Sequence, residues 1–243
     1  MKSSKSRFVL GLALLCTGII FDLPVRAQAQ TFTNVAAFNG EDGNLPWSSV
    51  IQATDGNFYG TTEQGGANRW GTVFRMTPAG ELSDIYSFCA QPNCTDGRYP
   101  SFGPILGSDG NLYGVTPFGG SSINAGTFYK MTIDGEITTL VTFCPALPCV
   151  GGTSPNGVIQ ASNGNFYGTT LYGGKSDGGT LFEISPTGAF KVLQSFCFPP
   201  NCADGATPTM PPIQASNGNL YGTTTIGGRQ GHGVVYEMTS AGT

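Results

Sequence analysis

The chain has few charged residues, one histidine and no segment with the 3.6-residue apolar period of an amphipathic helix. Charged side chains make up 11% of the 243 residues, whereas soluble domains average about 25%. The missing helical period excludes helical bundles and α/β folds. The sequence also contains no defensible Ser/His/Asp arrangement, no phosphate-binding glycine loop before a helix and no cluster of metal ligands. We therefore predict no catalytic residue, no cofactor and no metal.

A long hydrophobic run occurs only near the start of the chain. Residues 1–7 carry three basic side chains, residues 8–21 are dominated by apolar residues, and Ala27-Gln28-Ala29 has the pattern of a cleavage site. This order is typical of a secretory signal peptide, and about 14 apolar residues are too few to span a bilayer. We predict a signal peptide over residues 1–29, a mature domain over residues 30–243 without a membrane span, and a secreted, periplasmic or cell-surface location.

Basic residues are scarcer still once the leader is removed. Residues 30–243 contain seven Lys or Arg and fourteen Asp or Glu, which gives a formal charge of −7. Because nucleic-acid binding depends on basic surfaces, a nucleic-acid partner is excluded.

Glycine is abundant, at 37 residues, and it belongs to a repeat. The stretch Asp55-Gly56-Asn57-Phe58-Tyr59-Gly60-Thr61-Thr62 returns three times, with its tyrosine at positions 59, 113, 167 and 221. A constant period of 54 residues indicates an array of supersecondary units that bury their apolar faces against one another.

Four short strands are expected in each period. In the first copy they are a run over residues 49–53, a return strand over residues 57–62, a third strand around residues 74–76 and a fourth over residues 85–88. A two-residue turn, Asp55-Gly56, is expected to join the first pair. Its counterparts are Asp109-Gly110, Asn163-Gly164 and Asn217-Gly218, so the position is expected to require turn geometry rather than a negative charge.

Four-stranded units at this spacing predict an all-β fold, a β-propeller of four blades. The last copy stops after its third strand, and an orphan segment, residues 32–38, has the spacing of a fourth strand. We predict that this N-terminal strand closes the ring in a monomer. The alternative is an open fragment of a larger propeller or repeat array.

The cysteines other than Cys16 form three pairs with identical spacing. In an exported protein this pattern predicts three local disulfides. The predicted bonds join Cys89 to Cys94, Cys144 to Cys149 and Cys197 to Cys202.

The pattern Asn-(Phe/Leu)-Tyr-Gly-x-Thr, then Gly-Gly, then Gly-Thr-Val-Phe, as in residues 57–76, resembles the bacterial GloVer repeat of choice-of-anchor tandem-repeat proteins. The resemblance extends over about residues 47–243. It implies an exported or surface-displayed repeat protein of unknown biochemical activity, which in this family often carries a C-terminal anchoring signal. A shorter, more distant similarity to streptogramin lyase-like propellers is confined to the Asp-Gly-Asn-Leu-Tyr run.

Function is expected where the copies differ, because identical residues serve the scaffold. The copies differ in the loop that follows Gly-Gly, and an exposed tryptophan there would suit a sugar or a protein partner. We therefore predict a non-catalytic extracellular binding or surface-interaction module for a glycan or a cell-surface protein. The alternative is a carbohydrate-active or lyase-type propeller enzyme that uses carboxylates at the mouth of a central channel. The candidate ligand contacts are Arg69, Trp70, Asn124, Lys175, Asp177, Arg229 and His232.

Overall fold

The computed structural model describes residues 30–198 and 200–239, so the predicted signal peptide lies outside the described residues. Contacts divide the chain into two units, Met1–Thr33 and Asn34–Thr243, and the second unit contains every strand. Within the described part of the chain, no helix is long and apolar enough to cross a membrane.

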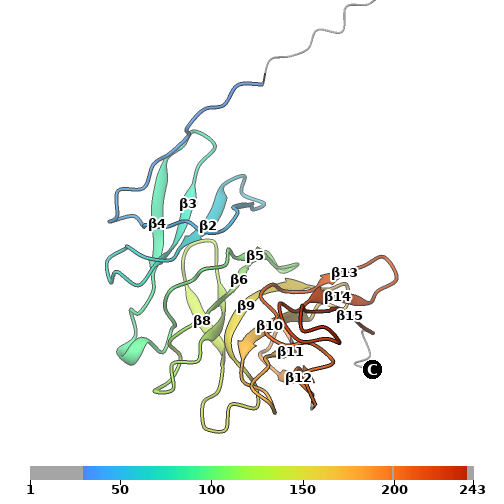
Figure 1. Ribbon diagram of the computed structural model, residues 1–243. Helices are drawn as coiled ribbons and strands as arrows, with labels where there is room; N and C mark the ends of the chain where they lie inside the picture. The colour runs from blue at the N-terminus through green and yellow to red at the C-terminus, as the bar shows by residue number, and fades with distance from the viewer. Residues whose placement is uncertain (1–29, 199, 240–243) are drawn as a thin grey trace, which may run out of the picture. The chain divides into compact units, whose positions relative to one another are not determined.

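The second unit is all-β and consists of four consecutive antiparallel sheets (Figure 1). Three sheets have four strands and the last has three, and each sheet follows chain order from its first strand outward. This is the strand order of propeller blades. The first two sheets comprise β1 (Ile51–Gln52), β2 (Phe58–Thr62), β3 (Thr72–Met76), β4 (Leu82–Ser87), β5 (Ile105–Leu106), β6 (Leu112–Thr116), β7 (Thr127–Met131) and β8 (Ile137–Thr142). The last two comprise β9 (Thr153–Gln160), β10 (Phe166–Tyr172), β11 (Thr180–Ile184), β12 (Phe190–Ser195), β13 (Ile213–Gln214), β14 (Leu220–Thr223) and β15 (Val235–Met238); a short 3-10 turn, η1 (Pro92–Cys94), follows β4.

The repeated Tyr-Gly-x-Thr motif builds the middle of each sheet. Tyr59 is fully buried, and its hydroxyl donates a hydrogen bond of 2.7 Å to Asp55. Gly60 pairs with Phe74, whose ring occupies the space that a side chain at residue 60 would need. Thr62 bonds the hydroxyl of Thr72 on the next strand at 2.9 Å. The motif is therefore a packing device, which explains why it recurs in every copy.

The hairpin between the first two strands is longer than the sequence predicted. Ala53 pairs with Asn57 through its backbone, which leaves a three-residue loop over residues 54–56 instead of a two-residue turn. Gly56 alone takes the left-handed conformation, with φ of 82°, as expected for the last residue of such a loop. The two-residue prediction was wrong because the turn starts one residue earlier: the backbone of Gly56 bonds the carbonyl of Ala53, and Asp55 does not adopt positive φ.

Neighbouring sheets contact each other through aromatic rings. The phenylalanine directly after a fourth strand packs on an aromatic residue of the next sheet's third strand, with ring centroids 5.1–5.4 Å apart. These pairs are Phe88–Tyr129, Phe143–Phe182 and Phe196–Tyr236. Each blade therefore completes its core only against its neighbour, as the repeat predicted.

The segment before the first sheet makes the same contacts as a fourth strand. Phe38 packs on Phe74 with ring centroids 5.0 Å apart, which matches the Phe88–Tyr129 contact. The carbonyl of Val35 lies against Gly80, just as the carbonyl of Ile85 lies against the corresponding glycine of the second sheet. Residues 34–39 nevertheless form no strand, and no described sheet is closed by this segment.

The fourth sheet has an open outer edge in the described residues. β15 pairs with β14 on one side only, whereas β3, β7 and β11 are each flanked on both sides. Val235 is consequently 77% exposed, although its equivalents Val73, Phe128 and Leu181 are fully buried. A cavity of about 460 Å³ follows this edge and includes Phe196 and Tyr236 in its lining.

The three predicted cysteine pairs all lie at disulfide distance. Each pair begins just after the phenylalanine that follows a fourth strand, and it closes a short loop before the next sheet. The buried Asp96 organises the first loop, because its carboxylate accepts hydrogen bonds from the backbone of Ala90 and Gln91. The pairs are Cys89 with Cys94, Cys144 with Cys149, and Cys197 with Cys202, as the sequence predicted.

Candidate functional site

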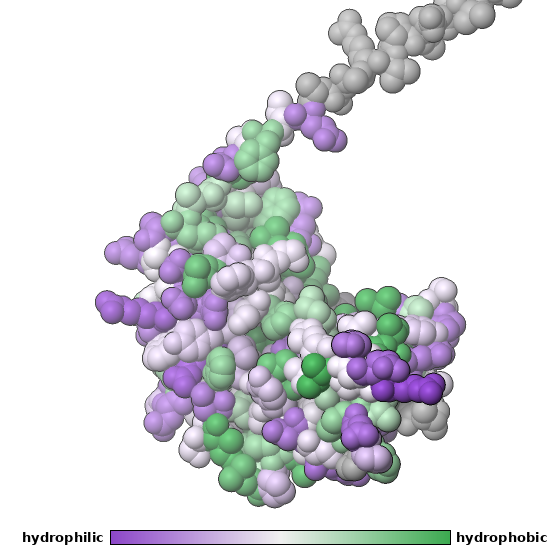
Figure 2. Space-filling view, viewed as in Figure 1, coloured by the Kyte–Doolittle hydropathy of each residue, from purple (hydrophilic) through white to green (hydrophobic). Residues whose placement is uncertain are grey.

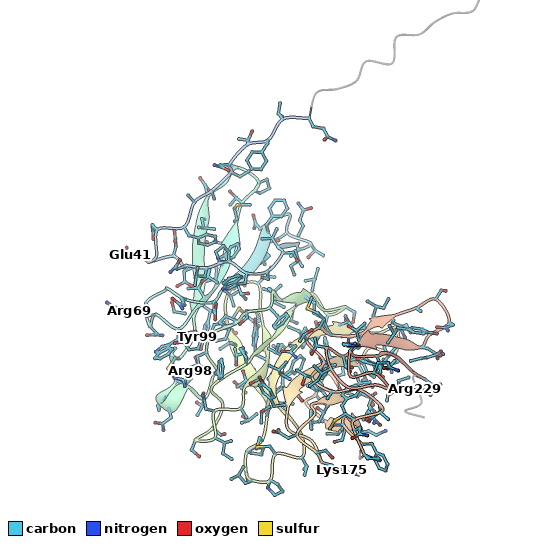
Figure 3. All side chains as sticks on the ribbon, viewed as in Figure 1. Glu41, Arg69, Arg98, Tyr99, Lys175 and Arg229 are labelled. Atoms are coloured by element: carbon cyan, nitrogen blue, oxygen red, sulfur yellow. A yellow bond between two sulfur atoms is a disulfide. The ribbon has the colours of Figure 1, made fainter. Side chains whose placement is uncertain are left out.

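The seven predicted contact residues lie in the loops that join the second and third strands of each sheet. Five of them have exposed side chains: Arg69, Lys175, Asp177, Arg229 and His232. Trp70 and Asn124 are half-buried. Figure 3 shows Arg69 beside Arg98 and Tyr99, whereas Lys175 and Arg229 lie on later parts of the chain. The structure therefore does not bring the seven residues together into one site.

Asn124 and Asp177 hold their own loops in place. Both have positive φ, 62° and 58°, a conformation that Asn and Asp tolerate better than other residues. Asn124 Oδ1 accepts a 2.6 Å hydrogen bond from the backbone of Gly119, and Asp177 Oδ1 accepts a 2.7 Å bond from Gly173. Their side-chain oxygens thus already have backbone partners, which gives them a structural role.

Trp70 lies at the boundary between the first and second sheets. Its carbonyl accepts a 2.8 Å hydrogen bond from the backbone of Tyr99, in the connection that leads to the second sheet. The rings of Trp70 and Tyr99 meet edge to face at 5.0 Å. The guanidinium carbon of Arg98 lies 4.7 Å from the centre of the indole ring. The tryptophan is therefore a platform for an arginine and is not an isolated exposed ring.

Arg98 is fixed by backbone and side-chain contacts. Its backbone pairs with that of Phe118, and its Nε donates a 3.2 Å hydrogen bond to Asn124 Oδ1. No carboxylate neutralises it, because the only ion pair in residues 30–198 and 200–239 joins Lys130 and Asp109. Stacking on Trp70 and the bond to Asn124 set the plane of the guanidinium before any ligand arrives.

A cavity of about 560 Å³ opens beside Arg98. It lies between the first disulfide loop and the loop that joins β6 and β7. Most of the surface that lines it is apolar, but the lining side chains other than the disulfide-bonded Cys94 carry polar groups and none is acidic: Asn93, Cys94, Thr95, Arg98, Ser121, Ser122 and Asn124. The arrangement is suited to binding a small polar group that carries a negative charge.

This combination occurs at one sheet boundary only. The positions equivalent to Trp70 carry Ala125, Gly178 and His232, and those equivalent to Arg98 carry Asn44, Thr153 and Ala206. The Arg98 site is therefore made of residues that are not repeated, whereas the strands that carry it are repeated. Figure 2 shows hydrophilic side chains interspersed with apolar ones on the visible face.

A second cavity lies where residues close to the first strands of all four sheets converge. Its volume is about 430 Å³, and it is lined by Trp47, Ser48, Phe102, Met210, Pro211 and neighbouring residues. Trp47 is 68% exposed, but no charged side chain lines this cavity. It offers apolar contact without the charge that would orient a substrate.

Neither the Arg98 cavity nor the cavity beside Trp47 is lined by a carboxylate that could serve catalysis. Burial raises the pKa of Asp84, and the charge of Asp42 contributes to the same shift. Asp84 does not line the Arg98 cavity, and its Oδ1 is buried without a hydrogen-bond partner. His232 is exposed in its loop. In the part of the chain that the structure describes, no group of three or more His, Cys, Asp or Glu could hold a metal ion.

Sequence reasoning missed Arg98 and Tyr99. Both lie in the connection between sheets, outside the loops in which the copies were compared. A signal was present, because Trp70 and Arg98 both stand at positions where the other copies carry different residues. Their proximity follows from sheet packing, which the sequence does not display.

Comparison with known proteins accounts for the repeat. The profile of the Gloeobacter/Verrucomicrobia repeat matches residues 16–210. The chain belongs to this repeat family. Membership confirms the resemblance drawn from the Tyr-Gly-x-Thr and Gly-Gly pattern. No curated protein matches the repeat protein.

Solved structures with some likeness to this repeat protein are distant in sequence. A protein assigned as a gluconolactonase has 14% identity and a TM-score of 0.45, covering 79% of this chain and 63% of its own. Puromycin hydrolase has 16% identity and a TM-score of 0.48, covering 81% of this chain and 30% of its own. Tricorn protease has 15% identity and a TM-score of 0.46, covering 80% and 18%. The repeat protein thus spans less than two thirds of each of them, and their activities are properties of those proteins.

Proposed function

We propose that the protein is an exported, non-catalytic binding module whose ligand contacts the Arg98 cavity. The observation that carries this proposal is the guanidinium of Arg98, held on Trp70 and Asn124 and unpaired with any described carboxylate. A guanidinium whose orientation is fixed and whose charge is not neutralised by a carboxylate is available to pair with an anionic group of a ligand. Its occurrence at a single boundary of a repeated scaffold is typical of a binding site added to a rigid frame.

Export is supported by two independent features. Residues 1–29 have the order of a secretory signal, and three cysteine pairs lie at disulfide distance. Disulfides persist in oxidising compartments and are rare in the cytosol. We therefore place the mature protein, residues 30–243, outside the cytoplasm.

The proposal includes a ring closed by the N-terminal segment. Two observations support it: the fourth sheet has no outer strand among residues 30–198 and 200–239, and residues 34–38 contact the first sheet as a fourth strand would. Pairing this segment with β15 would cover Val235 and supply the missing partner for the edge.

Binding can be tested by exposing the purified protein to an array of bacterial and plant glycans and, in parallel, to immobilised cell-surface proteins. We expect saturable binding to one class, with the bound molecule recovered unchanged. Conversion of any bound glycan into products would support the enzyme alternative. A protein that bound neither class would contradict the proposed function.

A further inference from the structure

We propose that the Arg98 cavity recognises the carboxylate of an acidic saccharide, an inference that rests on the proposed binding function. The guanidinium would pair with the carboxylate, and the hydroxyl and amide groups around it would pair with the sugar hydroxyls. Neither the repeat family nor the likenesses to solved structures assign a ligand to this cavity.

Arginine is the residue best suited to this task. Its planar fork of donors matches the two oxygens of a carboxylate, and pre-orientation reduces the entropy lost on binding. In this chain the orientation is provided by the indole of Trp70 at 4.7 Å and by the 3.2 Å bond from Nε to Asn124. That bond uses one donor, and the two terminal nitrogens of Arg98 have no acceptor among the described residues.

The remaining lining favours a sugar over a simple anion. Thr95, Ser121 and Ser122 contribute hydroxyls, and Asn93 contributes an amide, all within one cavity of about 560 Å³. Hydroxyl and amide groups can both donate and accept hydrogen bonds, as sugar hydroxyls do. A cavity of this volume has room for more than a free carboxylate.

A saccharide with one contacting carboxylate fits the charge of the protein better than a polyanion held by many charges. Residues 30–243 carry a formal charge of −7, and Arg98 is the only cationic side chain that lines the cavity. The net charge therefore repels an anion at long range, more strongly for a polyanion than for a single carboxylate, and recognition depends on the local pair.

The test measures binding of the purified protein by isothermal titration calorimetry. Galacturonate and glucuronate oligosaccharides are compared with neutral oligosaccharides of the same linkage, and acetate tests for a bare carboxylate. We expect an acidic oligosaccharide to bind at least tenfold more tightly than its neutral counterpart and than acetate. Arg98→Gln should abolish that preference.

Matched variants separate the role of Arg98 from general charge and from folding. Arg75→Gln removes an arginine of β3 that does not line the cavity, and it should leave the affinity unchanged. Arg98→Lys keeps the charge but loses the fork, and it should bind at least fivefold more weakly. Thermal unfolding of each variant shows whether the fold is retained.

The outcomes distinguish this inference from the proposed function. Equal binding of acidic and neutral oligosaccharides, or an acidic preference that survives Arg98→Gln in a folded variant, would overturn the inference while leaving a binding module intact. Binding to acetate as tight as to the oligosaccharide would show that the cavity is a simple anion site. Loss of all binding across glycans and surface proteins would overturn both.

Discussion

At the scale of single residues, a carboxylate and a tyrosine are coupled in every copy. In the first two sheets the carboxylate belongs to the turn, where Tyr113 donates a 2.9 Å hydrogen bond to Asp109. In the last two sheets the turn has asparagine, and the tyrosine donates instead to a glutamate on the third strand, as Tyr167 does to Glu183 at 2.9 Å. The change from Asp to Asn at the turn is therefore accompanied by a second change, which places a glutamate on the third strand. Turn geometry explains why Asn is tolerated at the turn, but it does not explain the glutamate.

This coupling predicts a rescue. Asp109→Asn removes the 2.8 Å ion pair with Lys130 and should cost about 0.5–1 kcal/mol of unfolding free energy at pH 7, because both side chains are partly exposed. Adding Lys130→Glu recreates the pair found in the third sheet and should recover most of the loss. Urea unfolding of the single and double variants measures the coupling.

The pH dependence of the same variant follows from the pKa of Asp109. Burial alone would raise that pKa, but the Lys130 pair and hydrogen bonds from Asn111 and Tyr113 lower it overall. A folded pKa below the unfolded one adds stability above the unfolded pKa of about 3.9, and this stability is lost as the pH falls further. The difference between wild type and Asp109→Asn should therefore shrink in strong acid. A constant difference from pH 7 to pH 2 would contradict this assignment.

Asp84 should behave in the opposite way. Burial raises its pKa in the folded state, so its ionisation costs stability as the pH rises through that pKa. Asp84→Asn should therefore raise the melting temperature at pH 7 and lose this advantage near pH 3, where the wild-type carboxyl is protonated. The exposed Asp134→Asn is the matched control. Destabilisation by Asp84→Asn at neutral pH would contradict this prediction and show that the ionised carboxylate stabilises the fold.

At the scale of elements, the sequence predicted most of the fold because each strand is short and locally encoded. The period of 54 placed the second strands closely, as with Phe58–Thr62, although β10 continues to Tyr172, two residues past its expected end. The fourth strands start earlier than predicted and end just before the aromatic residue, because Phe88 turns into the packing contact with Tyr129. Boundaries thus depend on packing between sheets, which is not local. The Arg98 site escaped prediction for the same reason.

The disulfide loops give a prediction for these connections. Under denaturing, non-reducing conditions the full chain should present one reactive thiol, that of Cys16, and the chain without residues 1–29 should present none. Each bond closes a short loop, for which chain entropy sets an upper contribution of roughly 2–3 kcal/mol. Thiol titration that counted six additional reactive cysteines would contradict the pairing.

At the scale of the whole molecule, stability should depend on the N-terminal segment. Deleting residues 30–39 removes the Phe38–Phe74 contact and, if the proposed ring is closed, also exposes β15. We expect aggregation or a loss of about 1–3 kcal/mol of unfolding free energy, since full burial of a phenylalanine side chain contributes about 1.5–3 kcal/mol and Phe38 is half-buried. A permuted chain with residues 30–39 placed after Thr243 should remain folded and monomeric.

Two other outcomes of this experiment are informative. A deletion variant that stayed monomeric and equally stable would contradict closure. Stable wild-type oligomers that the deletion dissolves would show that the segment pairs with β15 of a second copy instead. Light scattering together with thermal unfolding distinguishes these cases.

The central claim is that this repeat protein binds its ligand at the Arg98 cavity, and its two tryptophans test that claim most directly. Trp70 lies under Arg98, whereas Trp47 lines the cavity where the four sheets converge. Trp47→Phe leaves Trp70 as the only indole, and Trp70→Phe leaves Trp47. Titrating both variants with the tightest-binding glycan should change the fluorescence of Trp70 saturably and leave that of Trp47 unchanged. A response confined to Trp47 would place the ligand in the central cavity and contradict the account.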